Sequence, residues 1–383
     1  MIGEIKKALS VTHHPGISKR VTLPLLVNNA LPYFFSFKGR AKPPITIYWG
    51  VNSVCNLKCK MCDVGMEVEE SNFFKNLRLN GERDEIEIDV FRRVVDEVAD
   101  DKPMIAITST EPLIYRPLPE AIEHARKKGL EVTVTTGAYN LPTRAADLID
   151  AGLQSINVSL DGPPALHNEI RGRKDSFQRA IEGIQRMKTL AAAKPNHPMR
   201  ILVNVTITNH NFFAIADLVE MLRKEPIDHI NITFMSYVNQ DMANRHNALW
   251  GQKYAATVNC MAGGTDPAAV DLDEVRRQLQ IIRTQHADRA TVLPNMSEWQ
   301  LQRFFREPTK FISGTRCMVS WFIAQIIANG DVIPYTRCYN VPLGNVRTQS
   351  FKEIWNGAQM MAWRKDLRRE HRFPACSRCD QCH

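Results

Sequence analysis

The sequence predicts an α/β fold, a partial (β/α)6 barrel followed by a small C-terminal α+β domain. Two observations support this prediction. Short β-branched segments alternate with helical segments between residues 45 and 236, and eight of the nine cysteines form two groups near opposite ends of the chain. Alternating strands and helices imply parallel strands joined by right-handed helical crossovers. With 383 residues, the chain can form one large domain and a smaller one.

Six segments rich in β-branched residues predict the strands of the barrel. They are 45–51, 104–109, 130–136, 154–160, 200–207 and 229–235. Five segments with helical character lie between them, at 90–100, 118–129, 143–152, 176–190 and 213–225. Six strands fit an open, partial barrel better than a closed barrel of eight strands.

The same pattern divides the chain into four regions. These are a lead-in (1–44), the barrel (45–236), a linker that contains the substrate-site segment (237–314), and a cysteine-bearing domain (315–383). The strand–helix repeat is predicted to stop after residue 237, and the linker contains one long helix at 273–287. The apolar stretch 23–37 either packs on the core, which is the favoured interpretation, or makes peripheral contact with a membrane surface.

Composition narrows the class of protein. The chain is 44% hydrophobic and 23% charged, with a formal net charge of +8, which is ordinary for a globular protein. No apolar run approaches the ~20 residues that span a bilayer, and the N-terminal residues lack the shape of a secretory signal, so we expect a cytoplasmic protein. No RNA-binding motif is evident and no nucleic-acid partner is expected. In a reducing compartment, clustered cysteines favour metal binding over disulfides.

A group of three cysteines follows the first predicted strand. In "VNSVCNLKCKMCDVG", Cys55, Cys59 and Cys62 have the spacing C-x3-C-x2-C. Loops at the C-terminal ends of parallel strands carry the active groups of such folds. Three thiolates on a cubane 4Fe–4S cluster leave one iron open to an outside ligand, whereas structural zinc is closed by four ligands. A zinc knuckle or plain ferredoxin site would need a nearby fourth Cys or His, and none follows in this loop.

This motif after the first strand of a partial barrel resembles the radical S-adenosylmethionine (radical SAM) superfamily. The resemblance implies that Cys55, Cys59 and Cys62 hold a 4Fe–4S cluster whose open iron is chelated by S-adenosylmethionine (SAM). Family members carry a Gly-Gly-Glu-Pro-like stretch after the second strand, where this chain has "STEP" (109–112). By resemblance, Ser109, Thr110 and Glu111 contact SAM, and the missing glycines add Cβ atoms near the ligand.

Other SAM-contacting positions are implied by the same resemblance. The segment "INVSLDGPPALHNEIRG" (156–172) resembles the family's fourth strand, which assigns Ser159 and Arg171 to the ribose and carboxylate of SAM. An alternative for Arg171 is a salt-bridged residue of a surface helix. Further candidates match the ribose and adenine positions, and they are Met61, Asn204 and Met235. Met61 stands where the family commonly has an aromatic residue, and its sulfur can pack on the adenine.

The C-terminal region resembles the twitch and SPASM domains, which carry auxiliary iron–sulfur clusters. Gly330-Asp331 marks the expected hairpin, but Tyr335 stands where the family usually has a cysteine. The resemblance implies five metal-ligand candidates, Cys317, Cys338, Cys376, Cys379 and Cys382. Five thiols suffice for one auxiliary 4Fe–4S cluster with one to spare. Zinc in a four-cysteine ribbon remains an alternative.

The resemblance also implies a reaction. An external one-electron reductant such as flavodoxin or ferredoxin reduces the first cluster, and SAM is then cleaved to a 5′-deoxyadenosyl radical. This radical removes a hydrogen atom from the substrate inside the barrel, whose interior is expected to be apolar. The 44 residues before the first strand are too few for a leader-peptide domain. We therefore expect a small molecule (a sugar, aminocyclitol or nucleoside) more than a lipid or a ribosomal peptide. A non-catalytic iron–sulfur carrier is a distant alternative.

The expected outcome is oxidation or epimerisation of the substrate, as in a radical SAM oxidoreductase or epimerase. Epimerisation requires a hydrogen-atom donor, and Cys260 lies outside both cysteine groups. The favoured interpretation of Cys260 is a small buried hydrophobe, as free cysteine commonly is. The alternative is a hydrogen-atom donor on a segment folded over the barrel mouth, where Gly263 and Gly264 let the chain bend near a ligand.

Overall fold

The computed structural model describes residues 20–36, 38–77, 83–314, 316–334, 338–339 and 341–379. Its described strands form one sheet in the order β7-β6-β5-β4-β3-β2-β1-β8-β9. The bounds are β1 Thr46–Trp49, β2 Met104–Ile107, β3 Val132–Thr136, β4 Ser155–Ser159, β5 Arg200–Ile207, β6 His229–Phe234, β7 Ala290–Leu293, β8 Ile323–Ile326 and β9 Val332–Ile333. All neighbouring strands are parallel except β8 and β9. The six predicted strands are confirmed as β1 to β6.

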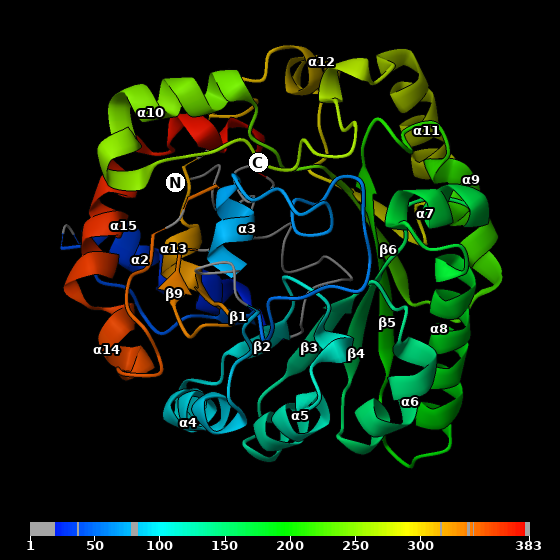
Figure 1. The fold of residues 1–383 in the computed structure, drawn as a ribbon, viewed down its shortest axis with the longest axis horizontal. Coiled ribbons are helices and arrows are strands. Elements are labelled where there is room, and N and C mark those ends of the chain that lie inside the picture. Colours follow the sequence, from blue (N-terminus) through cyan, green and yellow to red (C-terminus); the bar gives the residue numbers. More distant parts are fainter. Residues whose placement is uncertain are drawn as a thin grey trace.

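The predicted crossover helices are also present and cover the outside of the curved sheet (Figure 1). They are α4 Ile88–Val98, α5 Leu118–Lys127, α6 Leu141–Asp150, α8 Ser176–Ala192 and α9 Ile215–Met221, and the long helix predicted in the linker is α11 Leu272–Gln285. Further helices are α2 Leu23–Phe35, α3 Asn72–Leu77, α7 Pro164–Arg171, α10 Gln240–Tyr254, α12 Glu298–Arg306, α13 Val319–Phe322, α14 Phe351–Trp355 and α15 Ala358–Glu370.

The two faces of the barrel sheet differ in chemistry. Residues on the helix-facing side, such as Ile156, Val203 and Ile232, are apolar and fully buried in the core. Residues between them, such as Asn204 and Asn231, face the barrel interior and are half-buried. The expectation of an apolar interior is therefore wrong for these central strands. The alternation itself explains the difference, because only the helix-facing half of each strand is packed against other side chains.

The repeat does not stop after residue 237. Strand β7 pairs in parallel with β6, with Ala290 opposite Ile230, so α11 and β7 add one more helix–strand unit. The sequence pattern missed this unit because a long segment that includes α10 separates β6 from α11 and β7.

The C-terminal region extends the barrel sheet instead of standing apart from it. Strand β8 pairs in parallel with β1, with Ile323 opposite Thr46, and β9 then folds back on β8. The hairpin turns at Gly330, whose φ of +87° favours glycine, as the Gly-Asp pair predicted. Barrel and tail therefore share one continuous sheet.

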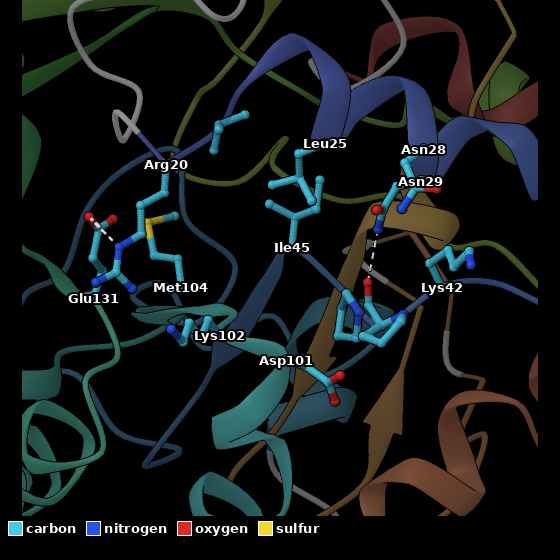
Figure 2. A pocket seen from close by; sticks show the side chains of 13 residues that line it. Arg20, Leu25, Asn28, Asn29, Lys42, Ile45, Asp101, Lys102, Met104 and Glu131 are labelled. Carbon is cyan, nitrogen blue, oxygen red and sulfur yellow. Dashed lines mark hydrogen bonds and ion pairs between the residues drawn. The ribbon is translucent and has the colours of Figure 1, made fainter.

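The apolar stretch of the lead-in forms α2, which packs on α13. Buried Tyr33 lies edge-to-face on Trp321, with ring centroids 4.8 Å apart, which confirms core packing for one face of the helix. A pocket of about 160 Å³ lies between α2 and the N-terminal ends of β1 and β2 (Figure 2). Its lining includes Leu25, Ile45 and Met104, so this pocket lies at the end of the sheet opposite the three-cysteine loop. Within the described part of the chain, no helix is long and apolar enough to cross a membrane.

Candidate active site

The three-cysteine loop begins directly after β1 and is partly covered by apolar side chains. Cys59 is buried, and Cys55 and Cys62 are half-buried. The latter two pack against a small apolar cluster, which consists of Val64, Phe73, Leu77, Ile327 and Ile333. Because Ile327 and Ile333 come from the β8–β9 hairpin region, the tail forms part of the wall around these thiols.

Two thiols of this loop, those of Cys55 and Cys59, do not ionise readily by themselves. Burial, and then the nearby Cys59 and Glu111, raise the pKa of Cys55 to about 12. Burial also raises the pKa of Cys59 to about 11, although Arg171 opposes the shift. Three thiolates in this loop therefore need a bound cationic centre to balance their charge.

The arrangement of the thiols bears on which centre fits. Among the residues with described positions, no three Cys, His, Asp or Glu side chains converge tightly enough to hold a single metal ion. A cubane cluster binds each cysteine at a separate iron, so its ligands lie farther apart than those of one ion. The three thiols of Cys55, Cys59 and Cys62, with no described fourth ligand, fit a 4Fe–4S cluster with one open iron.

Arg171 reaches Cys59 from the end of α7 and is held by a buried acid. Its Nε donates to Asp161 Oδ2 at 2.6 Å, and its Nη1 lies 3.6 Å from Cys59 Sγ. The Arg171 side chain is only 12% exposed, so it lies inside the site and not on an outer helix surface. Burial opposes the charge of Arg171, but Asp161 and Cys59 outweigh that effect and raise its pKa.

Asp161 is a site residue that the sequence analysis missed. Its side chain is 1% exposed, and its Oδ1 has no hydrogen-bond partner among the described residues. A buried acceptor without a donor fits a site that receives a polar ligand. The sequence offered one signal for Asp161 as a site residue, namely its position in "SLDG", two residues after the predicted SAM-contacting Ser159.

The "STEP" segment keeps the backbone shape of a glycine loop without glycine. Ser109 has φ of +89°, a region that side chains rarely adopt, and its Oγ accepts from Gln325 Nε2 at 3.4 Å. Thr110 Oγ1 is bound to Asn52, with its oxygen 2.8 Å from the Asn52 carbonyl. The strained turn therefore lies beside β8, because Gln325 belongs to that strand.

Glu111 is buried and already bound. Its carboxylate accepts from Thr136 Oγ1 at 2.6 Å, Gly137 N at 2.9 Å and Leu113 N at 3.0 Å. Burial raises the pKa of Glu111, although these three donors oppose the rise. The structure therefore gives Glu111 a role in joining the loop after β2 to the end of β3, whatever its role toward SAM.

Two of the remaining predicted SAM positions lie together in the barrel interior. Ser159 is the register partner of Asn204, and Asn204 is the partner of Asn231. Asn231 Nδ2 donates to Asn204 Oδ1 at 3.0 Å, whereas the buried Asn231 Oδ1 has no partner within the described chain. Met235 is buried after β6, and Met61 is half-buried in the three-cysteine loop. Asn231 was not predicted, although it is a polar residue in a strand as Asn204 is.

Cys260 lies against the three-cysteine loop. It is 2% exposed, and its N–H donates to the buried Asp63 carboxylate, with distances of 2.9 and 3.0 Å to the two oxygens. The backbone at Gly263 approaches Lys60 so closely that a Cβ there would lie 2.4 Å from the Lys60 carbonyl oxygen. The segment after α10 therefore closes over this loop, and Asp63, directly after Cys62, is the residue that fastens it.

Three cysteines of the tail gather around one tyrosine, Tyr339. Burial, and then Cys376 and Cys338, raise the pKa of Tyr339 far above its usual value, and its Oη lies 3.3 Å from Cys376 Sγ. Cys379 also contributes to this shift. Cys317 is buried and its N–H donates to the His371 carbonyl at 3.0 Å. Cys382 lies outside the described residues.

A short helix, α3, connects the two cysteine groups. Asn72 Nδ2 donates to the Ala255 carbonyl at 2.8 Å and to the Cys338 carbonyl at 2.9 Å. Asn76 Nδ2 donates to the Tyr339 carbonyl at 2.9 Å. These two residues could not be predicted from the sequence, because an asparagine in a six-residue helix carries no distinctive signal.

Comparisons with known proteins agree with this geometry. Residues 51–191 match the profile of the Radical SAM superfamily, and residues 317–383 match the SPASM iron–sulfur cluster-binding domain. The chain is 24% identical to a pre-heme d1 synthase of Dinoroseobacter shibae, over 90% of this chain and 80% of that protein. It is 22% identical to a PqqA peptide cyclase of Xanthomonas axonopodis pv. citri, over 83% and 76% of the two chains.

A solved structure shows the same fold. SuiB of Streptococcus suis, bound to S-adenosylmethionine, superposes with a TM-score of 0.58 at 15% identity, over 94% of this chain and 76% of SuiB. The domain matches indicate SAM and 4Fe–4S clusters as cofactors, with which the thiols and unpaired buried acceptors of the site are compatible. The chain is therefore a radical SAM enzyme with a C-terminal SPASM iron–sulfur cluster-binding domain.

Proposed function

We propose that this enzyme removes a hydrogen atom from a small polar molecule, such as a sugar, aminocyclitol or nucleoside, bound in the barrel. The observation that carries the proposal is the row of uncharged polar side chains facing the barrel interior. Asn204 and Asn231 lie side by side, and Asn157 Nδ2 donates to Thr133 Oγ1 at 3.0 Å on the neighbouring strands. Amides and hydroxyls both donate and accept, so they suit a ligand rich in hydroxyl groups. An acyl chain would offer no donor to Asn231 Oδ1, which has no partner among the described residues.

The residues of this chain would hold and orient the reactants. Cys55, Cys59 and Cys62 would ligate the cluster, and Arg171, fixed by Asp161, would meet the carboxylate of SAM. When bound, the reduced cluster and SAM supply the 5′-deoxyadenosyl radical that removes the hydrogen atom. The segment carrying Cys260 covers the three-cysteine loop and would limit access of water to it.

Oxidation is the outcome that we favour over epimerisation. Epimerisation requires a protein thiol that can reach the substrate, and Cys260 is buried with its backbone fixed to Asp63. The tail thiols Cys338, Cys376 and Cys379 gather near Tyr339, and α3 joins their segment to the first cysteine group. With this proximity, the substrate radical would lose its electron to the auxiliary cluster that these thiols would hold, which completes a two-electron oxidation.

A tetrapyrrole side chain is the second candidate substrate. The specific support is the match to a pre-heme d1 synthase along most of both chains. The match to a PqqA peptide cyclase similarly keeps a peptide substrate as an alternative. The uncharged polar side chains of the central strands favour the polar small molecule over these two.

The test is SAM cleavage by anaerobically reconstituted enzyme with excess reductant. Candidate pools would be sugars and aminocyclitols, nucleosides, iron coproporphyrin and peptides, with 5′-deoxyadenosine measured by liquid chromatography. We expect a polyhydroxylated pool to stimulate cleavage and a deuterated substrate to transfer deuterium to 5′-deoxyadenosine. Stimulation and deuterium transfer by the coproporphyrin or peptide pool alone would refute the proposed substrate class. The triple variant Cys55→Ala, Cys59→Ala, Cys62→Ala is the control for enzyme-independent cleavage.

A further inference from the structure

The outer face of α2 presents an apolar stripe to solvent. Val27, Leu31 and Phe35 lie at intervals of four residues and are 39%, 44% and 71% exposed. The opposite face carries Asn29 and Tyr33, which are buried. A helix in a globular protein normally shows polar residues on its outer face, whereas α2 contains no charged residue at all. The face that carries Val27, Leu31 and Phe35 is therefore unusual, because it is apolar and yet exposed to solvent in the described part of the chain.

Helix α2 is also fixed to the body of the enzyme. Arg368 donates from Nη2 to the Phe34 carbonyl at 2.9 Å and from Nη1 to the Ser36 carbonyl at 3.1 Å. Asn29 Nδ2 donates to the Pro43 carbonyl at 2.9 Å (Figure 2). The stripe is thus held in a constant orientation and would act as a rigid surface.

Cations flank this helix in the sequence. Residues 1–44 contain seven lysines and arginines and one glutamate, a net +6 out of the chain's formal +8. Arg20 precedes α2 and is paired with Glu131 at 3.2 Å (Figure 2). The cations that follow the helix, Lys38, Arg40 and Lys42, are exposed. An apolar helix face bordered by cations suits the surface of a lipid bilayer, which has an apolar interior and can have anionic headgroups.

We propose that α2 and its flanking cations dock this enzyme on a membrane surface that contains anionic phospholipid, with Val27, Leu31 and Phe35 among the headgroups. The helix has 13 residues, about 20 Å of length, so it would lie in the interface and not span the ~30 Å core. The N-terminal ends of β1 and β2 border this helix. Docking there would leave the three-cysteine loop, at the opposite strand ends, open to substrate and reductant.

The first experiment is co-sedimentation of the full-length reconstituted enzyme with lipid vesicles. Vesicles would contain phosphatidylcholine alone or with about 30% phosphatidylserine, a content at which basic segments gain attraction from anionic lipid. We expect binding that requires phosphatidylserine and weakens as salt rises, because exposed charges are screened. Absence of binding, or equal binding to both vesicles, would overturn the proposal.

Matched variants separate the stripe from general surface effects. Leu31→Gln with Phe35→Gln removes apolar side chains, and Leu249→Gln is the control because Leu249 is 73% exposed on α10. Lys38→Glu with Arg40→Glu reverses charge, and Arg186→Glu with Lys224→Glu is the control at other exposed cations. The charge reversal should weaken vesicle binding about tenfold or more, since each cation near a membrane contributes about fivefold. The Leu31→Gln, Phe35→Gln pair should also weaken it, because binding of an interfacial helix scales with its buried apolar area. The control variants should bind as the parent protein does.

Other occupants of the stripe give different results. If a second copy of this chain covers it, analytical ultracentrifugation will show a dimer that Leu31→Gln with Phe35→Gln converts to monomer, and the membrane proposal fails. Equal loss of vesicle binding in the control variants would also refute it. SAM cleavage and the circular dichroism spectrum should be unchanged in the α2 variants, so failure here is distinct from failure of the proposed function.

Discussion

At the scale of single residues, Asp161 has the clearest expected effect. Asp161→Asn removes the charge that balances Arg171, and breaking a buried ion pair costs about 3–5 kcal/mol of folding free energy. We expect the free energy of unfolding of the apo-protein to fall by about 3 kcal/mol, measured by urea denaturation. Iron content after reconstitution should stay unchanged, while the dissociation constant for SAM rises. Asp161→Glu should recover part of both losses, and an Asp161→Asn protein of parental stability would contradict the pairing.

The three loop cysteines give a second prediction. Because a 4Fe–4S cluster contains four irons, the reconstituted enzyme should bind about eight irons per chain and the Cys55→Ala, Cys59→Ala, Cys62→Ala variant about four. SAM cleavage should disappear in that variant. Replacement of the tail cysteines should spare some cleavage. Zinc in the tail, or cleavage by the triple variant, would refute the respective cluster assignment.

Cys260 gives a third prediction, which concerns the outcome of the reaction. Because its thiol is buried, we expect Cys260→Ala to retain product formation with the true substrate. In deuterated water, the parent enzyme should place no deuterium at the reacting carbon. Loss of product with retained SAM cleavage, together with deuterium in the parent product, would instead establish Cys260 as a hydrogen-atom donor.

Some of these residues could be predicted from the sequence and others could not, for a physical reason. The cysteines, Glu111 and Arg171 stand in motifs whose spacing is set by local chain geometry. Asp161 is important because α7 brings Arg171 back into contact with it. Asp63 is important because Cys260, about 200 residues later in the chain, donates its N–H to the Asp63 carboxylate. Contacts of this kind depend on tertiary packing, which local patterns do not encode.

At the scale of elements, helix α3 is the connection between the two cysteine groups. Asn72→Leu would leave the carbonyls of Ala255 and Cys338 without their donor, and a buried polar group without a partner costs about 1–3 kcal/mol. We expect the free energy of unfolding to drop by about 2 kcal/mol. Asn244→Leu, at an exposed position of α10, is the control and should change it little.

The same scale shows which elements a sequence pattern can find. Strands β1 to β6 and their helices were predicted because each combines a continuous β-branched run with an amphipathic helix behind it. Strand β7 follows β6 only after a long segment that includes α10, and β8 pairs with β1 from the far end of the chain. Their place in the sheet depends on which edge is available, and a one-dimensional pattern contains no information on that.

At the scale of the whole molecule, the shared sheet predicts one cooperative unit. Unfolding of the apo-protein in urea should give the same midpoint by far-UV circular dichroism, which follows all secondary structure, and by tryptophan fluorescence. The tryptophans report both parts, since Trp49 is buried in β1 and Trp355 and Trp363 in the tail. Coincident transitions are the mark of two-state behaviour. Two separate transitions would show that the tail unfolds independently.

The pairing of β8 with β1 also has a consequence for biosynthesis. Thr46 and Ile323 are partners 277 positions apart, so one edge of β1 has no neighbour until most of the chain has left the ribosome. At roughly 5–20 residues per second, this edge stays open for tens of seconds. An open apolar strand edge is a template for aggregation. The yield of native protein should therefore depend on translation speed, temperature and chaperone supply more strongly than the stability of the finished fold would suggest.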